Sequence, residues 1–269
     1  MTQNEGKSMS FIHRMRPEPG LRVLITAGAS GIGAVTAKAF LEAGAKVLIC
    51  DIDAPALAAF AAAHPGLLTE VADVSVPEAV DALADTVRSQ LGGLDVLVNN
   101  AGIAGPTGAI DALEVDDIRR TLEVDLMSQF LVTRRCAALL RESRGSILNM
   151  SSVAGRLGIS LRTPYAAAKW GIVGLTESLA RELGPDGVRV NAILPGIVRG
   201  DRIRRVLTAR AEAEGLTYDE MEKAYLQNTS LRRMVEPEDI ASIALFLCSP
   251  AGANISGQAI SVCGNVETL

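Results

Sequence analysis

Short aliphatic runs alternate with longer helical segments along almost the whole chain, and this alternation limits the possible folds more than any other feature of the sequence. A strand that reads as one continuous apolar run is buried on both faces, which is typical of parallel sheets covered by helices. The sequence therefore predicts an α/β fold with a single doubly wound domain and a parallel sheet. Strands are expected at residues 22–26, 47–50, 67–71, 94–98, 146–150, 188–193 and 259–262. Helices are expected at residues 33–43, 54–63, 77–91, 115–142, 163–183 and 237–248.

The pattern is interrupted at its start and near its end. Residues 1–20 are predicted to be a flexible leader, because the stretch MTQNEGKSMS is polar and PEPG interrupts regular structure before the first strand. The leader lacks the apolar core of a signal peptide, and the alternative interpretation is an arm that packs against a partner subunit. Residues 21–269 are expected to form one domain, in which the charged, helical segment 200–233 is an insertion over the top.

Charge and composition argue against several classes of protein. The net charge is -5 and the sequence pI is near 5.2, whereas a nucleic-acid-binding protein usually carries a clustered basic surface. No uninterrupted apolar run approaches the roughly 18 residues of a membrane span. The cysteines are far apart without a CxxC pair and the histidines are isolated, so neither a metal site nor a disulfide framework is indicated. We therefore expect a protein of the cytoplasm that binds a small-molecule substrate, with no nucleic-acid or membrane partner.

A glycine-rich turn, TAGASGIG, joins the first expected strand to the first helix at residues 26–33. Glycines let the backbone approach a pyrophosphate, and the free N–H groups at a helix start attract its charge. The order is GxxGxG rather than the GxGxxG of the common dinucleotide fingerprint, and the alternative is an ordinary glycine-containing loop. Because the turn follows the first strand of a doubly wound sheet, we interpret the domain as Rossmann-type, with a phosphate site here. The residues expected to contact the phosphates are Gly28, Ser30, Gly31, Ile32 and Gly33.

Polar residues at the ends of the next strands extend this predicted site. Asp51 closes the second strand, where a carboxylate accepts hydrogen bonds from the adenosine ribose hydroxyls and repels a 2′-phosphate, so the sequence favours NAD over NADP. The alternative is an aspartate that merely starts a turn in Asp51-Ile52-Asp53. The other strand-end positions expected to line the same cleft are Asp73, Val74, Asn99, Ala101 and Gly102.

Tyr165 and Lys169 lie four residues apart on an expected helix and so share one face. A free tyrosine is a poor base at neutral pH, but a nearby ammonium group stabilises its phenolate form. Tyr165 is then a candidate to take the proton of an alcohol as hydride leaves, or to donate it in the reverse direction. Ser152, directly after the fifth expected strand, is placed to hydrogen-bond the reacting oxygen. The alternative is an ordinary amphipathic helix that happens to carry a Tyr and a Lys.

From about residue 21 to residue 263 the chain resembles the short-chain dehydrogenase/reductase family. The motifs that carry the resemblance are the TAGASGIG turn, Asp51, Asp73, the NNAG segment 99–102, Ser152, the YAAAK segment 165–169 and Pro195-Gly196. The resemblance implies that Tyr165 is the catalytic acid/base, that Lys169 binds the nicotinamide ribose and that Ser152 positions the substrate. It also implies that Asn99 helps to hold the adenosine side of the cofactor.

The same resemblance implies the remaining parts of the site and the assembly. The backbone of Pro195, Gly196 and Val198 is expected to meet the nicotinamide carboxamide, and residues 200–233 are expected to form the substrate lid. A homodimer or homotetramer is expected.

Four positions depart from the family pattern. Ala27 replaces a glycine of the turn, so the turn either keeps a negative φ there or is strained. Asp125 stands where the family usually has an asparagine that helps to hold a water in the proton relay; ionised, it would attract Lys169 and compete with Tyr165 for that charge, which predicts a shifted pH optimum. Gly200 replaces a threonine that commonly contacts the carboxamide. The segment 263–265 (Cys-Gly-Asn) replaces Asp-Gly-Gly, which concerns subunit contacts or the back of the site.

Arginines are frequent around the expected lid, among them Arg199 and Arg202. Because Arg pairs with planar carboxylates in a bidentate way, Arg156, Arg162 and Arg199 are candidates to bind an anionic group of the substrate; the alternative is surface ion pairs with nearby carboxylates. The sequence thus predicts an NAD-dependent oxidoreductase that transfers a hydride between nicotinamide and a small polar secondary alcohol or ketone, such as a sugar, polyol or hydroxy acid. The alternatives are a 3-oxoacyl thioester reductase and a nucleotide-sensing binding protein with little catalysis.

Overall fold

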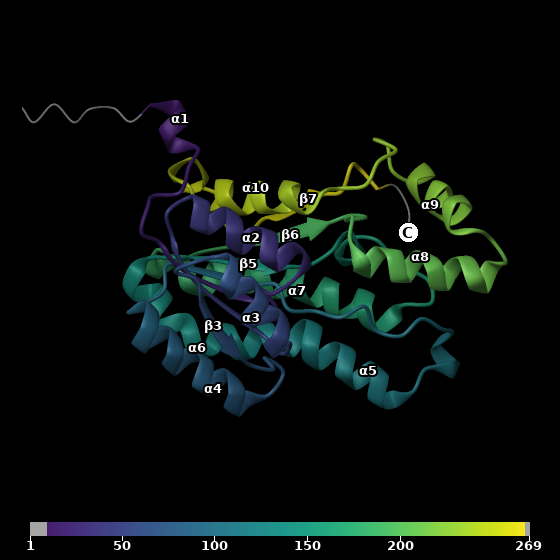
Figure 1. Ribbon diagram of the computed structural model, residues 1–269, viewed down its shortest axis with the longest axis horizontal. Helices are drawn as coiled ribbons and strands as arrows, with labels where there is room; N and C mark the ends of the chain where they lie inside the picture. Colours follow the sequence, from purple (N-terminus) through teal and green to yellow (C-terminus); the bar gives the residue numbers. More distant parts are fainter. Residues whose placement is uncertain (1–9, 267–269) are drawn as a thin grey trace, which may run out of the picture.

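Seven parallel strands form the centre of the part of the chain that the computed structural model describes, residues 10–266 (Figure 1). They are β1 (Arg22–Thr26), β2 (Lys46–Asp51), β3 (Leu68–Val71), β4 (Val96–Asn99), β5 (Ser146–Met150), β6 (Arg189–Pro195) and β7 (Ala259–Val262). The strand order is β3-β2-β1-β4-β5-β6-β7, so the direction of winding reverses between β1 and β4. Ligands of open α/β sheets bind at this reversal, outside the carboxyl ends of the strands. The predicted doubly wound α/β fold is confirmed.

Helices cover both faces of the sheet. They are α2 (Gly31–Glu42), α3 (Ala54–Ala63), α4 (Pro77–Thr86), α5 (Val115–Leu122), α6 (Ser128–Ser143), α7 (Thr163–Leu183), α8 (Asp201–Glu214), α9 (Tyr218–Gln227) and α10 (Pro237–Leu247). Because side chains alternate along a strand, β1 feeds two cores: Leu24 belongs to one with Leu83 of α4 and Leu140 of α6, and Ile25 to another with Phe40 of α2. Figure 1 shows α2 and α10 together on one side of the sheet and α4 and α6 on the other.

Two of the expected helices contain a π-helical turn. The expected helix 77–91 is α4 followed by η1 (Val87–Leu91), and the expected helix 115–142 is α5 and α6 joined by η3 (Glu123–Met127). A π turn holds one extra residue, which changes the direction of the side chains that it carries, and such turns occur frequently at functional sites. The periodicity of a sequence does not reveal a single extra residue, so the π turns were not predicted.

The insertion 200–233 forms the helices α8 and α9, which pack against each other at the carboxyl end of the sheet (Figure 1). Leu207 of α8 and Met221 of α9 are both buried, in a small core separate from the two cores of the sheet. The insertion is therefore a folded element in its own right over the expected site.

The expected leader contains one helical turn that the sequence analysis did not predict. This turn, α1 (Phe11–Arg14), begins at Ser10, whose side chain accepts a hydrogen bond from the N–H of His13. Its apolar side chains are exposed, with Phe11 at 86%. Residues 1–9 lie outside the described residues, and with them most of the predicted flexible leader.

The cysteines of the described residues are free, and other special features are absent from the same part of the chain. The four cysteines are free, and burial raises the pKa of the Cys50, Cys136 and Cys248 thiols to about 12. Between residues 10 and 266, no three His, Cys, Asp or Glu side chains gather as metal ligands would. Within the same residues, no helix combines the length and the apolar character that crossing a membrane requires.

Candidate active site

The glycine-rich turn between β1 and α2 is held by close backbone packing. Ala27 adopts a φ of 50°, so of the two expected options for this residue, a negative φ or strain, the backbone is strained. A Cβ on Gly33 would lie 2.2 Å from the carbonyl oxygen of Ala27. The side chain of Asn100 holds the same carbonyl, because its Nδ2 donates hydrogen bonds to the oxygens of Thr26 (3.1 Å) and Ala27 (3.0 Å). Asn100 was not predicted as an anchor, although its place in the NNAG segment was a signal for it.

The start of α2 has the properties of an anion site. Ser30 precedes the helix and makes no capping hydrogen bond with its side chain, so the N–H groups of the first turn keep their capacity to bind an acceptor. Gly31 adopts a φ of 53°, a conformation that favours glycine. Gly28 serves packing, since a Cβ there would lie 2.5 Å from the Cβ of Ile49. The exposed helix start and the close glycines fit the pyrophosphate of a dinucleotide.

Asp51 lies beside this turn at the end of β2. Its Oδ2 accepts a hydrogen bond from the N–H of Ala29 (3.2 Å), and its Oδ1 accepts one from the N–H of Asp53 (3.2 Å). The bond from Asp53 is the one expected if Asp51 merely starts a turn, which was the alternative interpretation. The bond from Ala29 ties Asp51 to the glycine-rich turn. Each carboxylate oxygen has a second lone pair, so Asp51 keeps the acceptors that a ribose hydroxyl needs.

The side chain of Asn99 lies in the interior of the protein. It is 1% exposed, and its Nδ2 donates hydrogen bonds to Thr133 (3.0 Å) and Asn149 (2.9 Å) in the interior. An amide side chain that faces the core does not face a cofactor, so the prediction for Asn99 is limited to its backbone at the end of β4.

Asp73 is engaged by neighbouring side chains. Its Oδ1 accepts a hydrogen bond from the N–H of Ser75 (2.9 Å), and its Oδ2 pairs with Arg120 (3.0 Å). Burial acts to raise the pKa of the Asp73 carboxyl, but the hydrogen bonds from Ser75 and Arg120 outweigh burial and hold the pKa below its usual range. Val74 and Ala101, the neighbouring cleft residues, are buried.

Tyr165 and Lys169 lie on α7, and Ser152 lies directly after β5 at the start of an element that packs against α7. The Nζ of Lys169 lies 5.5 Å from the centre of the Tyr165 ring and donates a hydrogen bond to the carbonyl oxygen of Met150 (3.3 Å). Ser152 begins a short 3-10 helix, η4 (Val153–Gly155), which packs against α7. The three side chains therefore come from two elements that are in direct contact.

A small residue makes this contact possible. A Cβ on Gly155 would lie 2.5 Å from the Oγ of Ser151 and 2.7 Å from the carbonyl oxygen of Lys169. The hydroxyl of Ser151 donates a hydrogen bond to that same carbonyl (2.8 Å). Gly155 and Ser151 thus fix how α7 approaches β5.

Asp125, on the π turn η3, lies against Lys169. Its side chain is fully buried, and its Oδ2 is 3.3 Å from the Nζ of Lys169. Its Oδ1 accepts a short hydrogen bond from the N–H of Ile103 (2.6 Å). Gly102 packs beside the pair, since a Cβ there would lie 3.2 Å from both Asp125 Oδ1 and Lys169 Nζ. The ammonium group of Lys169 therefore faces a carboxylate as well as Tyr165.

The segment after β6 is held by its two neighbours in space. The N–H of Gly196 donates to the oxygen of Val262 (3.0 Å), and Val198 bridges to Val235. A Cβ on Gly196 would lie 2.7 Å from the Cα of Cys263, which places the unusual 263–265 segment directly behind the expected carboxamide site. Gly200 adopts a φ of 148°, a conformation that favours glycine over the threonine common at this position.

Two of the three candidate substrate arginines contact other groups of the protein, and for Arg199 the contact is the surface ion pair of the alternative interpretation of the sequence. The guanidinium group of Arg156 donates to the oxygen of Ala259 and to the Oγ of Ser261 on β7. Arg199 forms an exposed ion pair with Glu236 (3.0 Å). A local sequence pattern does not reveal which distant element a long side chain will reach.

Arg162 remains at the candidate site, joined by Arg202. The Cζ of Arg162 lies 4.2 Å from the centre of the Tyr165 ring, and its Nη2 donates to the oxygen of Ala104 (2.6 Å). Arg202 of α8 donates to the oxygen of Gly102. Arg202 was among the lid arginines considered from the sequence but was not selected as a candidate, because nothing local distinguishes it from its neighbours.

The chain is similar to known proteins over most of its length. Residues 26–265 match the family model described as enoyl-(acyl carrier protein) reductase. The probable galactose dehydrogenase of Rhizobium meliloti is 38% identical over 257 residues, covering 92% of this chain and 96% of that protein. The galactitol 2-dehydrogenase of Agrobacterium fabrum is 36% identical over 244 residues, covering 90% and 95%.

A solved structure is similar over nearly its whole length. The 7α-hydroxysteroid dehydrogenase complexed with NADH and 7-oxo glycochenodeoxycholic acid has a TM-score of 0.87 and 34% identity, covering 96% of this chain and 98% of that chain. These relatives are oxidoreductases that act on alcohols.

Proposed function

The chain belongs to the short-chain dehydrogenase/reductase family, and from this premise we propose that it is an NAD-dependent oxidoreductase that transfers a hydride between nicotinamide and a small polar secondary alcohol or ketone. The observation that carries the proposal is the packing of α7, which carries Tyr165 and Lys169, against the element that Ser152 begins directly after β5. This packing lies on the same edge of the sheet as the glycine-rich turn, where a dinucleotide fits.

Tyr165 is the acid/base of the proposed reaction. Bound NAD supplies the hydride acceptor. The Tyr165 phenolate takes the hydroxyl proton during oxidation, and the phenol returns it to the ketone oxygen during reduction. The ammonium group of Lys169 stabilises the phenolate, and the hydroxyl of Ser152 donates a hydrogen bond to the substrate oxygen.

Asp51 supports NAD as the preferred cofactor. Its carboxylate is pinned beside the glycine-rich turn by the N–H of Ala29, and the neighbours Ser30 and Ile52 bring no cation for a 2′-phosphate. The Asp51→Ser variant is expected to lose preference for NAD over NADP by at least tenfold in kcat/KM, which corresponds to about 1.4 kcal/mol. A wild-type protein that turns over only with NADP would contradict this assignment.

Two of the three relatives, the probable galactose dehydrogenase and the galactitol 2-dehydrogenase, support a polar substrate, whereas the third is a steroid dehydrogenase. Arg162 at the candidate site is compatible with a sugar, a polyol or a hydroxy acid. We place the activity in the cytoplasm, because free buried cysteines are typical of a reducing compartment.

The decisive experiment follows the absorbance of reduced nicotinamide with a panel of sugars, polyols, hydroxy acids, a steroid alcohol and a 3-oxoacyl thioester. Wild type and Tyr165→Phe are compared with NAD and with NADP, after dinucleotide binding and thermal unfolding show that the variant is folded. Turnover that falls by about 10³-fold or more in Tyr165→Phe supports the mechanism. Dinucleotide binding with no Tyr165-dependent turnover on any substrate would favour a nucleotide-sensing protein instead.

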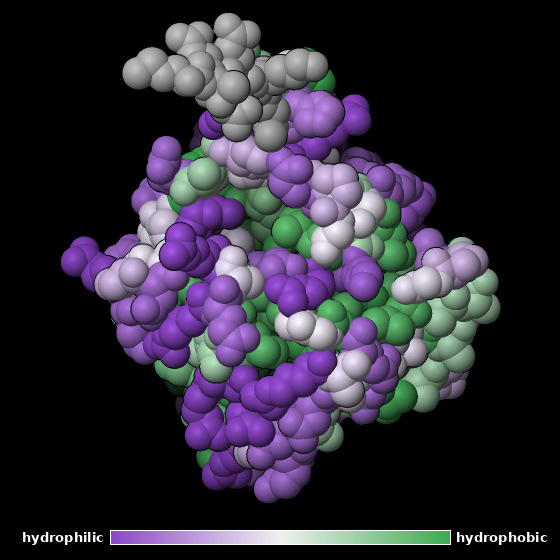
Figure 2. All heavy atoms as spheres, turned by 90° about the vertical axis from the view of Figure 1, so that its left-hand side faces the viewer, coloured by the Kyte–Doolittle hydropathy of each residue, from purple (hydrophilic) through white to green (hydrophobic). Residues whose placement is uncertain are grey.

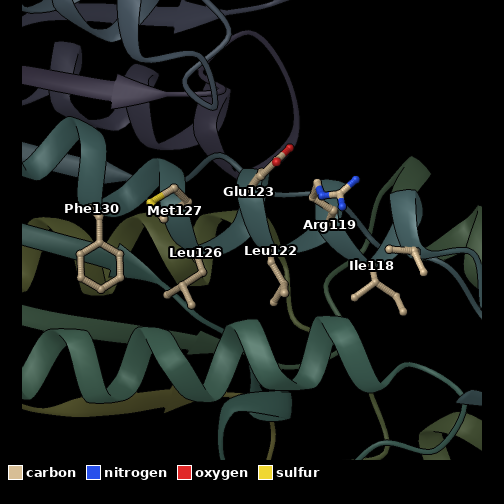
Figure 3. Close-up of a pocket in the computed structure, with 8 residues that line it drawn as sticks. Ile118, Arg119, Leu122, Glu123, Leu126, Met127 and Phe130 are labelled. Atoms are coloured by element: carbon tan, nitrogen blue, oxygen red, sulfur yellow. The ribbon is translucent and has the colours of Figure 1, made fainter.

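An apolar groove supports assembly with a second copy of the chain. Ile118, Leu122, Leu126 and Phe130 extend from one side of α5, η3 and α6 (Figure 3) and line a groove of about 410 Å³. Phe130 is 47% exposed, and Trp170 on α7 is 51% exposed. Apolar side chains gathered in this way mark an interaction surface, and a homodimer or homotetramer would cover them.

This assembly is tested by sedimentation velocity. The Phe130→Glu variant is expected to sediment as a smaller species than wild type, because a charge in the apolar groove opposes burial. Phe11→Glu is the matched comparison, since Phe11 is also exposed but lies on α1. Dissociation by Phe11→Glu alone would assign the contact to the leader, and a monomeric wild type would contradict both assignments.

A further inference from the structure

The positive charge of Lys169 is not free to act on Tyr165 alone. The side chains of Lys169 and Asp125 are 4% and 0% exposed, and their charged atoms are 3.3 Å apart. A buried carboxylate needs a cation beside it, so this pair has no net charge. The field of such a pair at a neighbouring ring is weaker than that of a single ammonium group.

Arg162 is a second cation at the same ring. Its Cζ is 4.2 Å from the centre of the Tyr165 ring, whereas the Nζ of Lys169 is 5.5 Å from it. None of the ion pairs between described residues involves Arg162. Its guanidinium group is therefore the uncompensated positive charge at the face of Tyr165.

The backbone fixes Arg162 in this place. Leu161 adopts a φ of 63°, a conformation that L-residues rarely adopt, and Arg162 follows it directly before the start of α7. The Nη2 of Arg162 is held by the oxygen of Ala104, and the neighbouring Ile103 donates its N–H to Asp125. The segment after β4 thus positions both the carboxylate that neutralises Lys169 and the guanidinium over Tyr165.

We propose that Arg162 is a positioning residue that stabilises the phenolate form of Tyr165 together with Lys169, whose charge Asp125 partly offsets. This inference rests on the proposed function for its effect on turnover. A guanidinium group stays charged at every relevant pH, and its attraction to the ring strengthens when the ring becomes a phenolate. Arg202 of α8 is a further cation on the same segment, since its guanidinium donates to the oxygen of Gly102.

The first test measures ionisation without cofactor or substrate. Tyrosinate absorbance is titrated for each protein and for the same protein with Tyr165→Phe, so that the difference removes the other two tyrosines, Tyr218 and Tyr225. In Arg162→Gln the ionisation of Tyr165 is expected at a pH higher by about 1. Glutamine keeps an amide donor for the oxygen of Ala104, so the change removes charge more than it removes the hydrogen bond.

Two further variants separate charge from structure. Arg156→Gln removes the same charge from the same loop, but Arg156 is bonded to β7, so the Tyr165 titration is expected to stay at the wild-type pH. Arg162→Lys keeps a cation without the planar stacking and is expected to restore part of the shift. An equal shift in Arg156→Gln and Arg162→Gln would overturn the proposal.

The second test measures turnover. The acidic limb of the pH–rate profile is expected to move to higher pH in Arg162→Gln. It is expected to move less in an Asp125→Asn background, where the charge of Lys169 is no longer offset by a carboxylate. A raised KM with an unchanged Tyr165 titration would assign Arg162 to the substrate and overturn the proposal. If the wild type shows no turnover, the proposed function fails, while the absorbance titration still decides the role of Arg162.

Discussion

Arg22 and Asp95 form an ion pair at the amino ends of β1 and β4, whereas Lys169 and Asp125 form one at the opposite edge of the sheet. In the first pair, the Nε and Nη2 of Arg22 each donate a hydrogen bond of 2.8 Å to the Asp95 carboxylate, and the Arg22 backbone N–H donates a third. In the second pair, the Lys169 ammonium lies 3.3 Å from an Asp125 Oδ2 that accepts no hydrogen bond among the described residues.

The two pairs also differ in their surroundings. The Arg22 and Asp95 side chains are 30% and 20% exposed. Figure 2, which views the molecule from the left-hand side of Figure 1, shows hydrophilic side chains among hydrophobic ones. The Lys169–Asp125 pair is almost completely buried, and Gln129, one helical turn after Asp125, also has a buried oxygen without a partner. Buried polar atoms are normally satisfied, so these two unpaired oxygens set the Lys169–Asp125 pair apart from the fully bonded Arg22–Asp95 pair.

The largest expected effect comes from breaking the buried pair. Lys169→Met is expected to lower kcat/KM by about 10²- to 10⁴-fold, because the phenolate loses its ammonium group. It is also expected to lower the free energy of unfolding by about 3 kcal/mol, because Asp125 is left as an uncompensated buried charge. Both are measured on the same preparations, by steady-state kinetics and by urea unfolding.

A double variant separates these two losses. Asp125→Asn combined with Lys169→Met removes the stranded carboxylate and is expected to regain most of the lost stability while activity stays low. Regained activity would mean that Lys169 serves structure alone, and the contrast between the two pairs would then disappear.

Breaking the amino-end pair is expected to give the opposite profile. Arg22→Met removes the bidentate contact with Asp95 and the bond to the oxygen of Gly92, and is expected to cost about 2 kcal/mol of unfolding free energy. The value of kcat/KM is expected to stay within about twofold of wild type, since no residue of the candidate site touches this pair. A loss of activity at unchanged stability would contradict the structural assignment of Arg22.

The sheet was predictable because its signal is local. Buried aliphatic runs such as Val47–Ile49 specify strands wherever they occur, and the strand order places their carboxyl ends on one edge. The same logic predicts that Ser152 and Tyr165 lie on that edge. Ser152 directly follows β5, and Tyr165 is on α7, which packs against η4 and β5. For these residues, position along the chain is enough.

The direction of individual side chains was not predictable. Asn99 and Asn100 are adjacent and identical, yet the first faces the core and the second holds the glycine-rich turn. Arg156 and Arg162 share one loop, yet the first reaches β7 and the second stacks on Tyr165. Such choices depend on contacts between distant segments, which no local pattern encodes.

The Asp125→Asn variant tests the charge of the Lys169–Asp125 pair while it leaves the local hydrogen bonding intact. Asparagine keeps an acceptor for the N–H of Ile103, while Lys169 no longer faces a carboxylate. The free ammonium group then favours the Tyr165 phenolate, so the acidic limb of the pH–rate profile is expected to move to lower pH, by about 1 pH unit or less. Superimposable profiles of wild type and Asp125→Asn would show that the carboxylate does not act on Tyr165.

The smallest expected effect is an acid dependence of stability at the amino edge. Burial acts to raise the pKa of the Asp95 carboxyl, but the hydrogen bonds and charge of Arg22 outweigh burial and hold the pKa below its usual range. A carboxyl whose pKa is lower in the folded state contributes its full stability above its unfolded pKa of about 3.9 and loses it as pH falls through the folded value. The unfolding free energies of wild type and Asp95→Asn are therefore expected to differ most near neutral pH and to converge below about pH 4. A difference that stays constant down to the lowest pH would mean that the pair acts through the shape of its hydrogen bonds and not through charge, and the two edges of the sheet would then differ in geometry alone.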